Sequence, residues 1–215
     1  MNLVKADMKL FPKETRYIRW KRPMGRGLSI IGLFILAPVF CIIAMAIKIS
    51  EKEAPVVFKQ KRVGRDGQLF EIYKFRTMCV DAEQQLDQYL EQNEAGRAMF
   101  KLKKDPRITT IGRFLRKMSL DELPQLWNVA KGEMALIGPR PALPREVETY
   151  TSYEKKRLLV TPGCTGLWQV SGRSELGFDE MIELDLAYIH HCSFKLDMKI
   201  IAKTFFVILK AKGAY

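Results

Sequence analysis

The sequence predicts an α+β protein in which a helix-rich domain with a small β-hairpin follows a re-entrant membrane helix hairpin, broken at Pro38. Three observations carry this prediction. Residues 27–47 form a run of 21 residues without a charged side chain. Residues 56–78 read as two strands around a short turn. Beyond them, apolar residues recur at helical spacing. We place the boundary between the membrane segment, 1–50, and the domain, 51–215, where the uncharged run gives way to charged residues.

The uncharged run is long enough to reach across a membrane, because 21 helical residues span about 30 Å. Pro38 lies in its middle, where a proline removes a helical hydrogen bond and bends or breaks a helix. Each flank carries six Lys and Arg residues, with one acid in 13–26 and two in 48–65. Since basic flanks stay cytoplasmic, we expect the chain to enter the membrane, bend near Pro38 and return to the cytoplasmic side. A plain span, a buried core helix and a signal peptide ending near 44–46 are the alternatives.

The downstream elements follow from their residue patterns. Residues 56–63 and 69–78 alternate as strands around a four-residue turn that contains two glycines. We expect an acidic helix over 81–94, a basic amphipathic stretch over 107–117, and helices over 179–190 and 196–211. The last carries lysines beside apolar residues, which fits either an interfacial helix or a helix packed on the core. A further helix is expected to start between Ser119 and Asp121, because Pro124 is tolerated only in a first turn.

Composition points to anionic partners. Lys and Arg number 36 against 24 Asp and Glu, which gives a net charge of +12. This balance favours nucleic acid, acidic lipid or a phosphorylated substrate. The four cysteines lack metal-ligand spacing and indicate free thiols in a reducing compartment. The only two histidines are adjacent and point about 100° apart on a helix, so we interpret them as structural.

Asp121 and Glu122 form the most informative feature, because Arg116 precedes this acid pair and Arg140 follows it in a rigid Gly-Pro-Arg-Pro segment. One interpretation is structural: Ser119 and Glu122 have the spacing of a capping box at a helix start. The other is phosphate chemistry, since arginines bind phosphate oxygens in a bidentate manner. Beside arginines at a helix start, we expect the aspartate to have a low pKa and to stay ionised.

An ionised aspartate can attack phosphorus, and two carboxylates with substrate phosphates can hold Mg²⁺. Asp121 and Glu122 are therefore the candidate catalytic and metal-binding residues. Lys74 and Arg76 share a face of the second predicted strand. That face is either a solvated edge or a phosphate contact.

These motifs resemble the bacterial sugar transferase family of monotopic phosphoglycosyl transferases, over nearly everything from residue 22 to 215. The resemblance rests on eight elements in order: the apolar segment with Pro38, QKRVG at 60–64, YKFRTM at 73–78, DPR at 105–107, SLDELPQL at 119–126, GPRP at 138–141, PGCTGLWQVSGR at 162–173 and LD at 196–197.

The resemblance implies transfer of a sugar 1-phosphate from a UDP-sugar to undecaprenyl phosphate, with release of UMP. It places a cytosolic catalytic domain on the inner membrane, in capsule, exopolysaccharide or O-antigen assembly. It implies that Asp121 is the nucleophile and that Glu122 acts with Mg²⁺. It implies phosphate-binding roles for the positions Arg116, Arg140, Lys74, Arg76, Arg173 and Asp197.

Some family members have Ser-Pro at the membrane bend, where this chain has Ala37-Pro38, and larger members carry extra N-terminal helices. We therefore expect this chain to be a minimal catalytic form, and a homodimer is compatible with its size.

The sequence does not choose between galactose, glucose and an N-acetylhexosamine. Two other classes of protein remain as alternatives for a chain with an excess of basic residues. One is a glycosyltransferase that releases UDP, and the other is a membrane-tethered nucleic-acid binder. We expect no nucleic-acid partner, because such a binder needs stacking aromatics among its basic residues.

Overall fold

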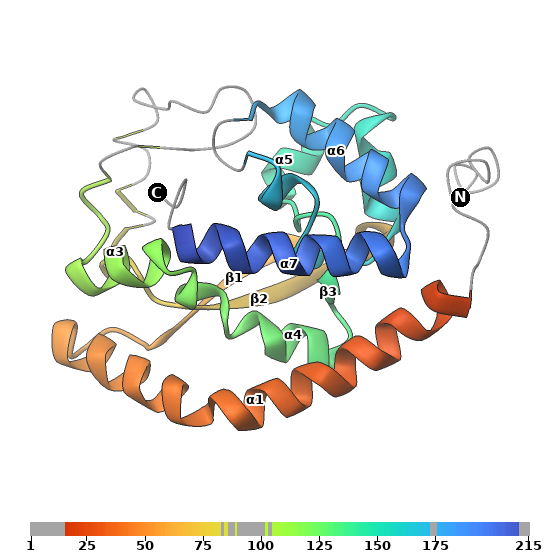
Figure 1. The fold of residues 1–215 in the computed structure, drawn as a ribbon. Helices are drawn as coiled ribbons and strands as arrows, with labels where there is room; N and C mark the ends of the chain where they lie inside the picture. The colour runs from red at the N-terminus through yellow and green to blue at the C-terminus, as the bar shows by residue number, and fades with distance from the viewer. Residues whose placement is uncertain are drawn as a thin grey trace.

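The computed structural model describes residues 16–82, 84–85, 89, 102, 105–172 and 176–210. One long helix, α1 (Arg16–Ser50), runs along one side of the molecule, and the remaining elements lie on its concave side (Figure 1). These elements are β1 (Val57–Val63), β2 (Leu69–Phe75), α3 (Thr110–Lys117), α4 (Gln125–Lys131), β3 (Ala135–Ile137), α5 (Pro144–Glu148), β4 (Gly163–Thr165), α6 (Phe178–His191) and α7 (Phe194–Lys210). Short 3₁₀ turns η1 (Arg65–Gly67), η3 (Leu120–Glu122), η4 (Glu154–Leu159) and η5 (Trp168–Val170) connect them.

The predicted β-hairpin is confirmed. Strands β1 and β2 pair antiparallel, from Val57 opposite Phe75 to Val63 opposite Leu69. The turn between them needs left-handed backbone at Asp66 (φ 55°) and Gly67 (φ 79°), conformations that Asp tolerates and glycine adopts freely. The helices predicted over 179–190 and 196–211 are present as α6 and α7, and α3 covers most of the basic stretch 107–117. Of the acidic helix predicted over 81–94, residues 81, 82, 84 and 85 are turns, residue 89 is helical, and the other nine lie outside the described residues.

Helix α1 differs from the prediction, because it continues through Pro38 without a break. The helix is instead curved, with its concave side toward the rest of the molecule (Figure 1). Long helices commonly curve around a core in this way, and Pro38 lies on the exposed side. The predicted division into two helices at Pro38 is therefore wrong for this structure. Within the described residues, α1 is the one helix long and apolar enough to cross a membrane.

Both ends of α1 are fastened to the rest of the protein. Near its start, Lys21 pairs with the buried Asp197 of α7 at 2.8 Å, and Tyr17 donates a hydrogen bond to the same carboxylate. Near its end, Ile43 and Ile47 are buried in a cluster with residues of β2 and α3. The concave middle packs on α4 and β3.

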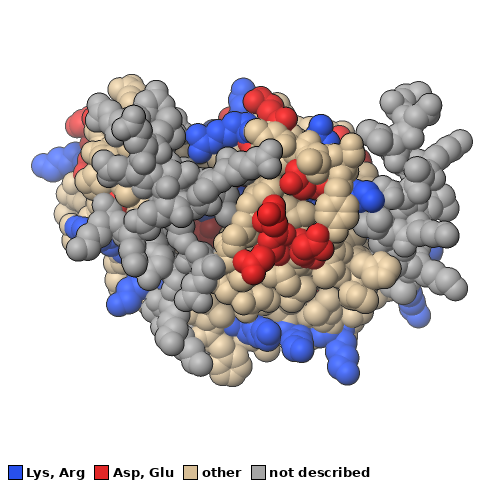
Figure 2. All heavy atoms as spheres, turned by 90° about the horizontal axis from the view of Figure 1, so that it is seen from above, with Lys and Arg blue, Asp and Glu red and all other residues tan. Residues whose placement is uncertain are grey.

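The opposite side of α1 is apolar and exposed. The large hydrophobic side chains there, with exposures reaching 78% at Phe34, are Leu28, Ile30, Ile31, Phe34, Ile35, Ile42, Met45 and Ile49. The face of the molecule away from α1 is different in character, because acidic side chains gather on it (Figure 2). The exposed acids of α5 and α6 are Glu148, Asp179, Glu180 and Glu183. The protein therefore has an apolar side with basic flanks and an acidic side opposite.

Strands β3 and β4 form a short parallel pair that the sequence did not predict. The pair depends on two glycines whose backbones nearly touch. A Cβ atom added at Gly163 would lie 2.0 Å from the backbone nitrogen of Gly138, and one at Gly138 would lie 2.8 Å from the carbonyl of Thr161. This contact sets the segment that carries Arg140 against β4.

We predict that Gly163→Ala destabilises the protein by about 3 kcal/mol or more, because the backbone of β3 must move to admit a methyl group. Thermal unfolding in detergent measures the effect. Gly27→Ala is the matched control, since a Cβ there meets nothing within 4 Å. Equal melting temperatures for the two variants would contradict the close approach.

Candidate active site

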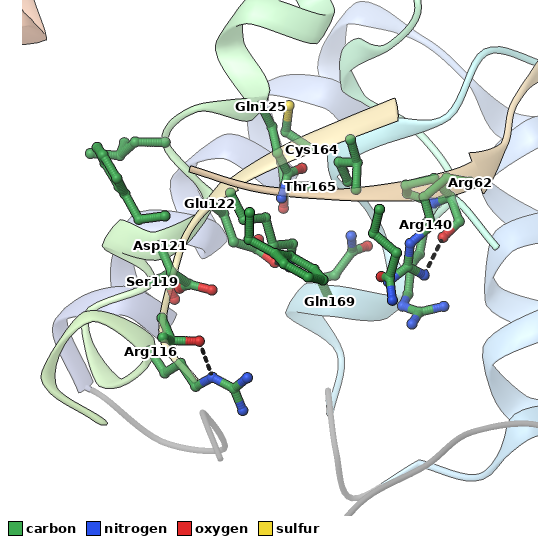
Figure 3. Close-up of a pocket in the computed structure, with 18 of the residues that line it drawn as sticks. Arg62, Arg116, Ser119, Asp121, Glu122, Gln125, Arg140, Cys164, Thr165 and Gln169 are labelled. Atoms are coloured by element: carbon green, nitrogen blue, oxygen red, sulfur yellow. Dashed lines mark hydrogen bonds and ion pairs between the residues drawn. The ribbon is translucent and has the colours of Figure 1, made fainter. Parts of the chain in front are cut away.

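The acid pair lies in the turn η3, directly before α4. Ser119 precedes it in a left-handed conformation (φ 54°, ψ 23°), which is strained for a residue other than glycine. The Ser119 side chain makes no capping hydrogen bond, and α4 begins only at Gln125, after Pro124. The capping-box interpretation of Ser119 and Glu122 is therefore wrong. The strained turn directs Asp121 and Glu122 toward a cavity (Figure 3).

This cavity has a volume of about 1410 Å³ and is bordered by the hairpin, η3, β4 and α7. It gathers most of the residues that the sequence analysis named: Lys74, Arg76, Arg116, Asp121, Glu122 and Arg140 line it. Arg173 lies outside the described residues. Asp197 does not line the cavity, because it is buried against Lys21 and Tyr188, with the Tyr188 hydroxyl 2.7 Å from its carboxylate. In this structure Asp197 fastens α1 to α7.

The two carboxylates of the pair have different surroundings. Glu122 accepts a hydrogen bond from the Lys74 ammonium at 2.6 Å. Asp121 is only 8% exposed. Burial raises the pKa of Asp121 to about 6, although Lys74 and Arg116 oppose this shift; the neighbouring Glu122 adds to it. The expectation of a low pKa is therefore wrong, because burial outweighs the nearby cations.

The cations near the acid pair differ in what they contact. Arg116 donates from Nε to the Thr77 hydroxyl at 2.9 Å, which holds its guanidinium at the cavity wall. Burial lowers the pKa of Arg116, and Asp121 opposes that shift. Arg76 lines the cavity but donates from Nε to the Pro55 carbonyl at 2.9 Å. Among the predicted residues, Lys74 and Arg116 thus interact most directly with the acid pair.

A second basic group lies at the other end of the cavity (Figure 3). Arg140 pairs with the buried Glu146 at 3.2 Å. Arg62, next to Arg140, donates to the Pro141 carbonyl at 3.1 Å and to Gln60 at 2.7 Å. Burial, and then the nearby Arg140, lower the pKa of Arg62 to about 9. Two guanidinium groups with one carboxylate leave this end electropositive.

The backbone of Arg140 accepts a hydrogen bond from the buried side chain of Arg157. This side chain is 2% exposed and donates to the Arg140 carbonyl at 2.9 Å. It also forms an ion pair with Asp185 of α6, which is fully buried. A buried pair from two distant segments therefore fixes the Gly-Pro-Arg-Pro segment.

Sequence reasoning missed Arg62 and the neutral polar residues of the cavity. The signal for Arg62 was present, because alternation along β1 places Phe58, Gln60 and Arg62 on one side, and Phe58 pairs with Lys74 across the hairpin. Gln125, Cys164, Thr165 and Gln169 also line the cavity. Burial raises the pKa of the Cys164 thiol, which stays neutral.

The protein ligands available in the cavity would bind a magnesium ion only together with phosphate oxygens of a substrate. Among the described residues there is no cluster of three or more His, Cys, Asp or Glu side chains arranged to hold a metal. Asp121 and Glu122 supply two carboxylates, and Mg²⁺ commonly binds to one or two carboxylates together with substrate phosphates.

Comparison with known proteins shows which proteins the whole chain is similar to. The family described as bacterial sugar transferase matches residues 16–211. A galactosyl transferase CpsE of Streptococcus agalactiae serotype III is 49% identical over 187 residues, which are 86% of this chain and 41% of that protein. An undecaprenyl-phosphate galactose phosphotransferase of Salmonella typhimurium is 41% identical over 217 residues, 99% of this chain and 45% of that protein. The chain thus spans less than half the length of these relatives.

A relative of similar length is also found. The exopolysaccharide production protein ExoY of Sinorhizobium fredii is 37% identical over 213 residues, which cover 95% of this chain and 94% of that protein.

Proposed function

We infer, from the premise that this chain belongs to the bacterial sugar transferase family, that it transfers a sugar 1-phosphate from a UDP-sugar to undecaprenyl phosphate. The observation that carries the inference is the buried Asp121, next to Glu122, in a cavity with basic groups at both ends. The Salmonella relative, an undecaprenyl-phosphate galactose phosphotransferase by name, supports the lipid acceptor and the transfer of galactose phosphate. The ExoY name supports a place in exopolysaccharide production.

The proposed reaction has two displacements at one phosphorus atom. The Asp121 carboxylate attacks the β-phosphorus of the UDP-sugar, and the bond to the bridging oxygen breaks, so that UMP leaves with that oxygen. Asp121 then carries the sugar phosphate as an acyl phosphate. A phosphate oxygen of the lipid attacks the same phosphorus, and the Asp121 carboxylate is released. Each step exchanges one P–O bond for another.

The charged residues around Asp121 supply electrostatic stabilisation. Arg116 lies beside Asp121, where it can bind the phosphate under attack, and Arg140 with Arg62 can bind a second phosphate. Lys74 holds Glu122 and favours the ionised form of Asp121. Glu122 and Asp121 would hold Mg²⁺, which would neutralise phosphate oxygens when bound.

The function is tested by identifying the leaving nucleotide. The full chain in nanodiscs is incubated with Mg²⁺, undecaprenyl phosphate and each of a panel of UDP-sugars. We expect UMP and a lipid-linked sugar diphosphate. Release of UDP with a lipid-linked sugar monophosphate would instead show a glycosyltransferase and reject the proposal.

The way in which α1 is fastened supports a placement on the cytoplasmic face of the inner membrane in which both ends of the helix stay on the same side. Tyr17 and Lys21 bind Asp197 at one end, while Ile43 and Ile47 pack on β2 and α3 at the other. A helix that crossed the bilayer would have to give up one of these contacts. The curved helix can instead bury its exposed apolar side in one leaflet, with its basic flanks at the lipid headgroups and the acidic face away from them.

This placement predicts the accessibility of both flanks. In a variant without its native cysteines, new cysteines at the exposed Arg16 and Glu53 should resist a membrane-impermeant thiol reagent in spheroplasts. Both should react after the membrane is opened. Labelling of only one of them in intact spheroplasts would show a full span.

Lys74 should set the pH dependence of the first displacement. The ionised form of Asp121 is the nucleophile, so UMP release should rise as pH increases through about 6. Lys74→Met removes a cation that lowers the pKa of Asp121, and we expect the midpoint to move up by about one pH unit. Single-turnover UMP release against pH measures this. Lys59→Met, on the exposed side of β1, should leave the midpoint unchanged.

A further inference from the structure

The middle of the cavity, between its two charged ends, is lined by neutral polar side chains. In the view of Figure 3, Gln125, Cys164 and Thr165 lie between Glu122 and the end that carries Arg62 and Arg140. All three line the cavity. The proposed reaction assigns them no role, since its steps use only the charged groups.

Gln125 is the most informative member of this group. It is 3% exposed, yet its amide forms no hydrogen bond with any other described residue. Its amide atoms are accessible from the cavity and are not sealed in the core, so a bound molecule can reach them. An amide at a cavity wall can donate to and accept from such a molecule. Gln125 begins α4 three residues after Glu122, which ties it to the same rigid turn as the acid pair.

The hydrogen bonds around Thr165 show which atoms it can offer a ligand. The Thr204 hydroxyl donates its only proton to the Ile200 carbonyl at 2.8 Å. The contact of 2.9 Å between the Thr165 and Thr204 hydroxyls therefore has Thr165 as its donor. The Thr165 oxygen is left as an acceptor at the cavity wall. The Gln125 amide, at the wall of the same cavity, supplies one acceptor and two donors.

This combination matches a hydroxyl group better than a phosphate. A phosphate only accepts hydrogen bonds at neutral pH, and it would meet the Thr165 acceptor and a neutral thiol. A sugar hydroxyl both donates and accepts, so it can donate to Thr165 and accept from the Gln125 amide. Uracil also donates and accepts. In a UDP-sugar, however, the sugar is joined through one oxygen atom to the phosphorus that Asp121 attacks, whereas uracil is separated from it by ribose and a second phosphate.

We propose that Gln125 and Thr165 form a subsite for the hydroxyl groups of the sugar being transferred. The proposal rests on the proposed function for the identity of the donor. It makes Gln125 and Thr165 residues that discriminate between sugars, at a place distinct from the two groups of cations.

Binding measurements test the subsite separately from catalysis. They use the full chain in nanodiscs, with Asp121→Asn to prevent turnover, and the UDP-hexose that binds most tightly from a panel that includes UDP-galactose. Gln125→Leu should weaken UDP-hexose binding about tenfold, the size expected for one or two lost hydrogen bonds, and leave UMP binding unchanged. Thr165→Val should act in the same direction and keeps the volume of the side chain. Gln68→Leu, the same change at an exposed site outside the cavity, should alter neither affinity.

Monodeoxy UDP-hexoses then identify the contact. Removal of one particular hydroxyl should weaken binding to the parent protein and have no further effect on the Gln125→Leu or Thr165→Val variant.

Equal losses for UMP and UDP-hexose would assign Gln125 to the nucleotide and overturn the subsite. Unchanged UDP-hexose binding in both variants would also overturn it. If the subsite behaves as expected while the unmutated chain releases no UMP, the sugar site stands and the transfer reaction fails. A chain that binds no UDP-hexose overturns both.

Discussion

Asp121→Asn should lower the rate of UMP release by at least about 10³-fold, because an amide is a poor nucleophile and forms no acyl phosphate. The same variant should be more stable than the parent protein. The pKa of Asp121 is raised in the folded state to about 6, so folding favours the protonated form. Its contribution to stability is present at low pH and is lost as pH rises through about 4 to 6.

Asparagine does not ionise and avoids this loss. At pH 8, with EDTA present, the free energy of unfolding of Asp121→Asn should exceed that of the parent by up to about 3 kcal/mol. Urea unfolding measures the difference, and the exposed Asp66→Asn should change neither activity nor stability. An inactive variant that is also less stable would show that Asp121 supports the fold. An active variant would remove it as the nucleophile.

Arg157→Met should destabilise the protein by about 3–5 kcal/mol, because it leaves the fully buried Asp185 without its partner. It should also reduce catalysis, since the Arg140 carbonyl loses the hydrogen bond that Arg157 donates. Thermal unfolding in detergent measures the first effect and single-turnover UMP release the second.

Two controls separate charge from packing at this pair. Arg157→Met combined with Asp185→Leu should recover much of the lost stability, because no buried charge remains. Recovery of stability without recovery of UMP release would show that Arg157 positions the Arg140 segment. Lys155→Met, an exposed neighbour, should have little effect. A stable single variant Arg157→Met would contradict the importance of the pair.

The parts of the fold that the sequence predicts correctly are those governed by local periodicity. The β-hairpin and helices α6 and α7 follow from alternation and from apolar residues at helical spacing. Strands β3 and β4 escaped prediction because each has three residues and their pairing depends on the contact between Gly138 and Gly163, which are far apart in the chain. The continuity of α1 through Pro38 also escaped, since packing of both helix ends against the domain is not visible in the local sequence.

In the candidate site, too, the sequence predicts local features correctly and misses those that depend on tertiary structure. Residue type and neighbouring charges identified Asp121, Glu122, Arg116 and Arg140, and these residues do line one cavity. The pKa of Asp121 was predicted in the wrong direction because burial is a property of the tertiary structure. Asp197 was grouped with the phosphate-binding candidates from resemblance, whereas its partners in the structure are residues of α1 and α6. Gln125 reads locally as an ordinary helical residue, and only its position against the cavity makes it notable.

The most direct test of the central claim is to trap the sugar phosphate on Asp121. The protein in nanodiscs is mixed with UDP-sugar carrying ³²P in the β-phosphate, without undecaprenyl phosphate, then quenched and analysed by peptide mass spectrometry. We predict label on the peptide that contains Asp121, no protein-bound label from α-labelled donor, and loss of the adduct when the lipid is added. Formation of the lipid product at full rate with no protein-bound label, or with label on another residue, would contradict the account.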